Sequence, residues 1–273
     1  MGENRLLAWL DFANGVTIAG RRIDPILAAF LFVLIVSAVF LVVPQLDIWV
    51  SSLFYDAKIG FPASFIPILV ALRQLNDIVL VAVIVVLVVS LIAKLVLPDR
   101  QSFVAPAASL FLLSSLVLGP GLVVNAILKN FSGRPRPIDV EQFGGNLPFV
   151  QVWHFTRECA RNCSFVSGEA SSAIWVVAVV LVLPLAYRAR ALRWALVYTV
   201  AISVNRIAFG GHFLSDVLLA WGITLLVIAV CYRLVYLQAP AWLQNERLES
   251  QLGRAGSGAR KAVTSVLTGE RRG

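Results

Sequence analysis

Ionisable side chains gather in the stretch NRIAFGGHFLSD, which lies between two long apolar runs. It carries Arg206, His212 and Asp216, and His212 is one of two histidines in the chain. His212 and Asp216 are four positions apart, so on a helix they share one face. A carboxylate in this position can hold one imidazole nitrogen while the other attacks an electrophile, as in nucleophilic triads. We therefore expect His212 to be a nucleophile that Asp216 orients.

Side chains that bind anions precede this pair in the sequence. The stretch KNFSGRPRP supplies Lys129 and Arg136, and Arg206 adds a third fixed cation. An arginine guanidinium presents its N–H groups in a fork that matches the oxygens of a phosphate. The three cations therefore predict a site for a phosphorylated ligand.

A third stretch, SFVSGE, places Ser167 and Gly168 at the start of an apolar run, where we expect a helix to begin. Free backbone N–H groups and the positive end of the helix dipole favour an anion there, and glycine lets it approach closely. No histidine, cysteine or carboxylate cluster in the sequence has metal-ligand spacing. We therefore expect a site that uses neither a metal nor another cofactor.

The elements that position these residues must lie in a membrane. The chain of 273 residues is 59% hydrophobic and 14% charged, with a mean hydropathy of +0.84. A soluble domain of this length cannot bury so much apolar surface. The net charge of +8 is spread over short loops, which fits membrane topology and argues against nucleic acid as a partner. No small-residue cleavage site follows the first apolar run, so we expect no cleavable signal peptide.

Apolar runs of about 20 residues predict an all-α polytopic membrane protein with six transmembrane helices. The expected spans are Pro25–Val43, Ile78–Leu97, Phe103–Leu128, Ala170–Tyr187, Ala191–Phe209 and Phe213–Leu234. Asn76 and Asp77 are candidate caps of the second span, and Gly119-Pro120-Gly121 is expected to kink the third. The segment between the first two spans mixes polar residues with Trp, Phe and Tyr, which favours a position in the membrane interface.

The distribution of basic residues predicts the orientation of the chain. If the N-terminus is cytoplasmic, fifteen of the 23 basic residues lie on the cytoplasmic side and eight on the other. The positive-inside rule then places both termini in the cytoplasm. In this topology all three polar stretches fall on the outer face, so residues far apart in the sequence converge there. For a bacterial inner membrane this is the periplasmic face.

One membrane domain and a short tail are expected. Residues 1–237 hold the six spans, and residues 238–273 form a polar tail in the cytoplasm. The tail contains the low-complexity stretch GRAGSGARK, which predicts a short helix followed by disorder.

The three stretches resemble the signature of the type 2 phosphatidic acid phosphatase superfamily, whose pattern is K-x6-RP, then PSGH, then SR-x5-H-x3-D. The first piece is matched in full, from Lys129 to Arg136-Pro137. The third is matched except that Asn205 replaces its serine. In the second piece Ser167 and Gly168 are kept, whereas Glu169 stands in place of the histidine. Spacing that agrees over three pieces is a strong motif.

The resemblance implies a role for each residue that matches. His212 would form a phosphohistidine, and Asp216 would orient its ring. Lys129, Arg136, Arg206 and the Ser167–Gly168 turn would hold the phosphoryl oxygens. In the family the histidine of the second piece protonates the departing alcohol, and here Glu169 occupies that position. Glu169 could instead pair with Arg206 or Lys129 and support the site as a structural residue.

Other polar residues have simpler interpretations. Arg134, Arg157 and Arg161 are expected to be topology anchors at span ends. His154 lies in an aromatic patch and is expected at the interface or in a lid. Cys159 and Cys163 permit either a small disulfide-closed loop on the outer side or two unpaired small residues. Cys231 is expected to pack in the core.

A lipid phosphate within the bilayer is the expected substrate. The outer loop holds Phe143, Phe149, Trp153 and Phe155, which suit the headgroup layer. The SGE variant is most similar to bacterial lipid A phosphatase-like members of the family. Polyprenyl phosphates, phosphatidylglycerophosphate and phosphatidic acid are alternative substrates. Two alternative functions are phosphoryl transfer from a polyprenyl diphosphate to another lipid, and binding or transport of anionic lipids without catalysis.

Overall fold

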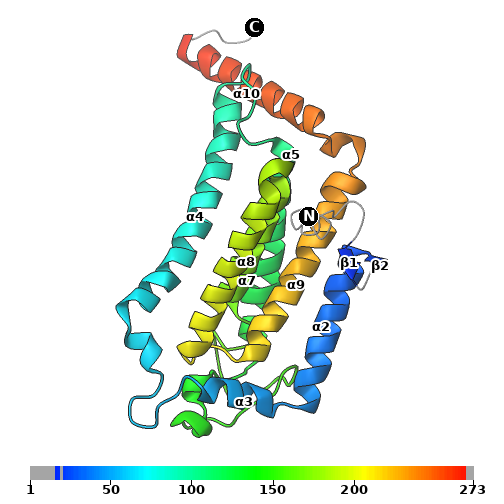
Figure 1. Ribbon diagram of the computed structural model, residues 1–273. Helices are drawn as coiled ribbons and strands as arrows, with labels where there is room; N and C mark the ends of the chain where they lie inside the picture. The colour runs from blue at the N-terminus through cyan, green and yellow to red at the C-terminus, as the bar shows by residue number, and fades with distance from the viewer. Residues whose placement is uncertain (1–15, 19–20, 269–273) are drawn as a thin grey trace. The chain divides into compact units, whose positions relative to one another are not determined.

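The chain folds into helices joined by short connections, as a computed structural model shows for residues 16–18 and 21–268 (Figure 1). The α-helices are α2 (Pro25–Val42), α3 (Gln45–Ser52), α4 (Pro67–Val96), α5 (Pro106–Leu116), α6 (Lys129–Phe131), α7 (Gly168–Val182), α8 (Leu185–Ala208), α9 (Leu214–Tyr232) and α10 (Asn245–Thr268). The π-helical segments are η2 (Val117–Leu128) and η5 (Arg233–Leu237). The 3-10 turns are η1 (Pro62–Phe65), η3 (Pro137–Asp139), η4 (Glu141–Phe143) and η6 (Ala241–Leu243). The strands β1 (Val16–Ile18) and β2 (Arg21–Ile23) pair antiparallel.

The helices have the lengths and apolar composition of a multi-pass membrane protein, which confirms the predicted all-α class. Four helical stretches within the described residues are long and apolar enough to cross a membrane: Pro25–Val42, Pro67–Val96, Pro106–Phe131 and Leu214–Leu237. Helices α7 and α8 lie at the fourth and fifth predicted spans. Helix α7 has 15 residues, and α8 carries several arginines in its first turns.

Several predicted boundaries are wrong, for identifiable reasons. Helix α4 begins at Pro67, so Asn76 is not a cap. It is buried, where its side chain donates to Ser172 Oγ (2.9 Å) and accepts from Tyr198 (2.8 Å). The predicted fourth span ended at Tyr187, but α7 ends at Val182 because Pro184 lacks an N–H and cannot continue the helix.

Two further segments have details that the sequence did not predict. The stretch around Pro120 is a π-helix, in which the Asn125 side chain donates to the Pro120 carbonyl (2.7 Å). The expected short helix of the tail is α10, which has 24 residues and continues through the low-complexity stretch. The prediction for the two chain ends concerns residues outside the described ranges.

The chain forms two compact units. Unit 1 comprises Met1–Ile78 and Ser115–Val230, and unit 2 comprises Val79–Ser114 and Cys231–Gly273. Helices α4, α5 and α9 each pass from one unit into the other.

Polar side chains join the helices of unit 1 around the buried helix α7. Thr199 of α8 donates to the Ala173 carbonyl (3.0 Å), and the hydroxyls of Ser171 and Thr224 lie 2.6 Å apart. Small residues and interhelical hydrogen bonds of this kind hold helices together in membranes, where apolar burial alone gives little preference. They fix the start of α7, which carries SFVSGE, against α8 and α9.

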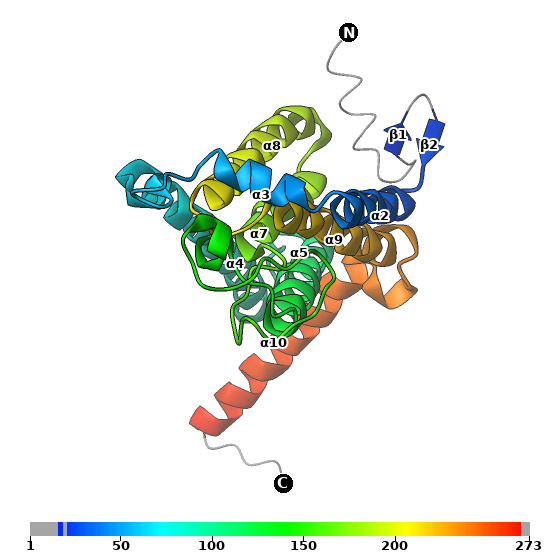
Figure 2. The same ribbon diagram turned by 90° about the horizontal axis from the view of Figure 1, so that it is seen from below.

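The three polar stretches lie at one end of unit 1. There α8 ends, α7 and α9 begin, and α3 lies beside the long segment between η2 and α7 (Figures 1 and 2). The predicted interfacial segment therefore contains a helix, α3, at the end of the unit where the candidate site forms.

Candidate active site

Backbone hydrogen bonds bring the three polar stretches together. Ser164 N donates to the Arg134 carbonyl (2.8 Å), and Ser167 N donates to the Asp216 carbonyl (3.1 Å). Ile138 N donates to the Gly210 carbonyl (3.0 Å) and so ties the first stretch to the third. The convergence predicted from the motif spacing is thus confirmed by contacts within unit 1.

His212 is buried in the connection between α8 and α9, with 1% of its surface exposed. Its Nδ1 lies 2.8 Å from the Ser164 carbonyl oxygen. Because a carbonyl can only accept, Nδ1 carries the hydrogen and Nε2 is left with a free lone pair. Burial lowers the pKa of His212 well below its ordinary value, and the positive charges of Arg206, Lys129 and Arg136 lower it further. The ring is therefore neutral near pH 7, as a nucleophile requires.

Asp216 does not orient His212 directly, which corrects the sequence-based expectation. Its Oδ2 accepts from the Ser164 hydroxyl (2.5 Å) and from Phe213 N (2.9 Å). Residues four apart share a face only inside a helix, whereas α9 begins at Leu214 and leaves His212 outside it. Ser164 contacts both residues, since its carbonyl accepts from His212 and its hydroxyl donates to Asp216. Asp216 can thus position the imidazole through Ser164.

Arg134 is a buried centre of the site and not the topology anchor that the sequence suggested. Its guanidinium is 1% exposed and donates to Asp216 Oδ1 (2.5 Å), Asp47 Oδ2 (2.8 Å) and the Val150 carbonyl (2.7 Å). Burial alone would lower the pKa of Arg134, but Asp216 and Asp47 raise it above its ordinary value. Arg134 is therefore a permanent cation that pairs with two buried carboxylates.

Asp47 was also missed in the sequence analysis. It lies on α3, where its side chain is 1% exposed and accepts from Ser215 N (2.8 Å) and Ser215 Oγ (2.5 Å). The sequence offered one indication, an acidic residue directly after the first apolar run. No periodicity linked it to residues so distant in the chain.

Glu169 is held between two arginines. Its Oε1 accepts from Arg73 Nε (2.8 Å), and its Oε2 pairs with Arg206 Nε. Arg206 is buried, whereas 49% of the Arg73 side chain is exposed. The pairing with Arg206 was one of the two alternatives for Glu169. The sequence analysis did not single out Arg73, which lies on the first turns of α4 and outside every motif.

Lys129 and Arg136 flank His212 at the end of η2 and in the loop that follows. Both are partly buried, and both act electrostatically on His212. The Arg136 guanidinium donates to the Asn162 carbonyl (2.8 Å). A disulfide joins Cys159 to Cys163, so these cysteines are paired and close the loop that carries Asn162.

The turn Ser167–Gly168 begins α7, as the sequence predicted. The Ser167 hydroxyl is the N-cap and accepts from Ala170 N (3.3 Å), while Ser171 N donates to the Ser167 carbonyl (3.0 Å). The earlier N–H groups, those of Gly168 and Glu169, precede the intrahelical ladder and can bind an anion. A Cβ at Gly168 would lie 2.5 Å from Asn125 Oδ1, so a larger residue here would require the Asn125 side chain or the start of α7 to move.

The remaining candidates are not part of the contacts around His212. His154 lines a cavity of about 830 Å³ together with Trp49 and Phe149. Cys231 is buried, as expected for core packing. Among the described residues, no group of three or more His, Cys, Asp or Glu side chains is arranged to hold a metal.

The arrangement of helices and site residues is that of a membrane protein with a buried imidazole near three cations. Residues 108–239 match the sequence profile of the PAP2 superfamily. A lipid A 4'-phosphatase from Francisella tularensis subsp. novicida (strain U112) is 32% identical over 214 residues, which cover 72% of this chain and 89% of the relative. This chain therefore belongs to the PAP2 superfamily.

Two other relatives carry the same name over a shorter region. Lipid A 4'-phosphatases from Rhizobium etli (strain CFN 42) and Rhizobium leguminosarum are 48% and 44% identical over 122 residues, or 43% of this chain. The matched region spans about half the length of these relatives, 46% and 50% respectively. No solved structure matches the chain.

Proposed function

We propose that this protein is a metal-independent membrane lipid phosphatase that acts through a phosphohistidine intermediate. The observation that carries the proposal is the environment of His212, whose Nδ1 is fixed by a carbonyl while burial and three cations keep the ring neutral. A neutral, oriented imidazole serves as a nucleophile, whereas a protein that only bound anionic lipids would gain more from an imidazolium.

The phosphoryl group is bound by Lys129, Arg136 and Arg206 and by the backbone N–H groups at the start of α7. Donors of this kind neutralise the equatorial oxygens and stabilise the charge of the transition state. Their positions around His212 support in-line attack by Nε2 on phosphorus.

Glu169 supplies the proton for the leaving group. In the free protein its carboxyl group pairs with Arg73 and Arg206. Bound phosphate takes over Arg206 and adds negative charge beside Glu169, which raises the proton affinity of the carboxyl group. Glu169 can then be protonated in the substrate complex.

Two displacements complete the reaction. The lone pair of Nε2 forms the N–P bond while the P–O bond to the lipid breaks, and Glu169 donates its proton to the departing oxygen. Water then attacks the same phosphorus, loses a proton to Glu169 and releases inorganic phosphate, which returns the imidazole to its neutral form. Glu169 gives one proton in the first displacement and regains one in the second, so it ends the cycle in its starting form.

Trapping the intermediate tests the mechanism. Brief incubation of purified protein with a ³²P-labelled lipid phosphate, followed by denaturation in base, should leave acid-labile label on the wild type. His212→Ala should carry no label and release no phosphate, whereas His154→Ala should retain most of both. Turnover by His212→Ala would exclude the phosphohistidine, and a strict requirement for magnesium would count against this site.

The substrate class is a lipid A-type phosphate. The names of the three relatives support it, and exposed aromatic residues at the site's end of unit 1, Trp49 and Phe155, suit the headgroup layer. Phosphate release should be measured from a panel of lipid A, undecaprenyl diphosphate, phosphatidylglycerophosphate and phosphatidic acid. A higher kcat/KM for any of the last three than for lipid A would reassign the substrate.

The site faces the periplasm of a bacterial inner membrane, with both termini in the cytoplasm. The asymmetry of basic residues supports this orientation. A cysteine introduced at Gln142 should react with an impermeant thiol reagent in intact cells after the outer membrane is permeabilised. If it reacts only after lysis, the topology is inverted.

A further inference from the structure

Helix α10 follows the last candidate span and has two distinct surfaces. Its apolar positions recur at helical spacing, at Leu248, Leu252, Ala255, Ala259, Ala262, Val263 and Val266. Arg247, Arg254 and Lys261 are seven residues apart and form a separate stripe, here called the basic stripe. An apolar face flanked by basic residues is the pattern of a helix that lies in the plane of a membrane surface.

Contacts within unit 2 fix which side of α10 faces the protein. Glu249 pairs with Lys94 of α4 (2.9 Å) and accepts from Ser102 N (2.9 Å). A Cβ at Gly256 would lie 2.2 Å from the Leu95 carbonyl oxygen, so the two helices touch backbone to backbone there. The third side of α10 is therefore occupied at Glu249 and Gly256, whereas Val263, seven residues further along the same side, is exposed.

The ion pair of Glu249 also removes its negative charge from the surface. Burial alone would raise the pKa of Glu249, but Lys94 and Ser102 lower it below its ordinary value. Glu249 is thus an anion that Lys94 neutralises, and it does not offset the basic stripe.

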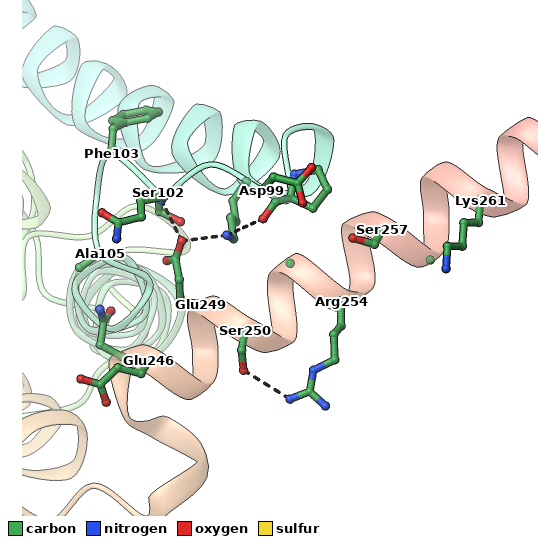
Figure 3. A pocket seen from close by; sticks show the side chains of 16 residues that line it. Asp99, Ser102, Phe103, Ala105, Glu246, Glu249, Ser250, Arg254, Ser257 and Lys261 are labelled. Atoms are coloured by element: carbon green, nitrogen blue, oxygen red, sulfur yellow. Dashed lines mark hydrogen bonds and ion pairs between the residues drawn. The ribbon is translucent and has the colours of Figure 1, made fainter.

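Both of the other surfaces of α10 carry exposed side chains. Val263 is 59% exposed and Val266 is 81% exposed. Arg247, Arg254 and Lys261 are also exposed, and none of them is in an ion pair with a described residue. Arg254 and Lys261 of α10 line a pocket of about 1000 Å³ within unit 2 together with Glu249, Glu246 and Asp99 (Figure 3).

The position of α10 brings these surfaces to the membrane. Helix α4 is a candidate span that ends at Val96, and α10 crosses its end (Figure 1). Trp242, in the turn that leads into α10, is 59% exposed, and tryptophan favours the headgroup layer. A helix in this position meets phospholipid headgroups along its length.

We propose that α10 is an interfacial helix that binds anionic phospholipids of the leaflet next to the end of α4. Val263, Val266 and the alanines enter the acyl boundary, while the basic stripe contacts the phosphates of acidic headgroups. Charge complementarity favours anionic over zwitterionic phospholipids, because each basic residue near an anionic surface adds an attraction that a zwitterionic surface does not supply.

An environment-sensitive fluorophore on Val266→Cys tests the proposal in the full-length protein. Cys231 is buried and Cys159 is bonded to Cys163, so the new thiol is the reactive one among the described cysteines. The labelled protein is reconstituted in nanodiscs of phosphatidylcholine alone or with phosphatidylglycerol. We expect a shift of emission to shorter wavelength that requires phosphatidylglycerol and that high salt reverses.

Neighbouring residues on different sides of α10 provide the matched control. Lys261→Gln and Arg254→Gln should each weaken the shift, whereas Arg260→Gln, which removes one charge outside the basic stripe, should leave it in place. An unchanged emission in acidic nanodiscs overturns the proposal, as does an equal loss in Arg260→Gln. A short-wavelength emission that persists in detergent shows that protein covers this face, which also overturns it. None of these readouts depends on phosphatase activity.

Discussion

The carbonyl of Ser164 accepts from Nδ1 of His212 (2.8 Å), and the hydroxyl of the same serine donates to Asp216 (2.5 Å). The acid of the motif therefore reaches the imidazole through one residue of the second stretch. This arrangement predicts that Ser164 and Asp216 act as one unit.

Ser164→Ala removes the hydroxyl and keeps the carbonyl. We expect kcat to fall about 10- to 100-fold, as when an outer-shell partner of a functional histidine is lost. Asp216→Asn should lower kcat at least as much, with little change in KM. Combined in one protein, the two substitutions should cost far less than the product of their separate effects, because neighbours that share a network are not additive. Fully multiplicative losses in this double-mutant cycle would mean that Asp216 acts independently of Ser164.

The buried ion pairs of Arg134 with Asp47 and Asp216 should contribute strongly to the free energy of unfolding. Asp47→Ala leaves Arg134 with one carboxylate and Ser215 without its acceptor. Breaking a buried ion pair costs about 3–5 kcal/mol, so the variant should unfold at a markedly lower temperature. The exposed Asp139→Ala is the control and should shift the midpoint little. Thermal unfolding in detergent measures both, and equal midpoints would contradict the assigned role of Asp47.

Glu169→Gln separates proton donation from structural support. The amide keeps the shape of the carboxyl group and one of its two acceptor oxygens but supplies no proton. We expect a loss of about 10²–10⁴ in turnover for a simple alkyl phosphate, the usual contribution of general acid catalysis. A sugar 1-phosphate or a diphosphate has a better leaving group and should lose less. Near-normal turnover with an unchanged pH profile would leave Glu169 as a support for Arg206.

The lowered pKa of His212 predicts the direction in which pH changes kcat/KM and the stability of the protein. The imidazole is neutral in the folded protein at pH 6.5, its ordinary pKa, and becomes protonated only at lower pH. The limb of kcat/KM that reports the nucleophile should therefore lie below pH 6.5. Below that pH the unfolded chain binds a proton that the folded protein does not, so the stability supplied by the neutral ring is lost. His212→Gln should lose less stability between pH 7.5 and 5.5 than the wild type. A nucleophile limb above pH 6.5 would contradict this environment.

Gly168→Ala should disable the site by displacing its neighbour. The added methyl carbon would meet Asn125 Oδ1 at 2.5 Å, so the start of α7 or the side chain of Asn125 must move. We expect a loss of activity in Gly168→Ala and partial recovery in Gly168→Ala/Asn125→Ala, measured as kcat/KM. Asn125→Ala alone is the control. Failure of the double variant to recover would show that the N–H groups, and not the contact, are what alanine disturbs.

The spacing of the motif residues identified most candidate residues of the site, because it indicates which side chains converge. Backbone hydrogen bonds join the three stretches, and Lys129, Arg136 and Arg206 act electrostatically on His212, while the roles of these residues stay predictions. Hydropathy likewise predicted the long apolar helices, since a span needs a continuous apolar run.

Residues outside the motifs could not be predicted in this way. Asp47, Arg73 and Arg134 are linked to the site by contacts between distant segments, and such contacts leave no periodicity in the sequence. Arg134 was taken for a surface anchor because an arginine at a span end is usually one. The role assigned to Asp216 was wrong in detail because four-residue spacing implies a shared face only within a helix.

The contacts of Asp47 also bear on how the protein is made. Asp47 and Ser215 are 168 positions apart, so the ribosome synthesises Asp47 long before Ser215, which donates to its carboxylate. Until the chain as far as Asp216 leaves the ribosome, neither His212 nor Asp216 is present in the membrane. A chain cut short before that point can insert most of its helices and still lack a working centre. Activity in the membrane thus reports that translation has continued at least as far as α9.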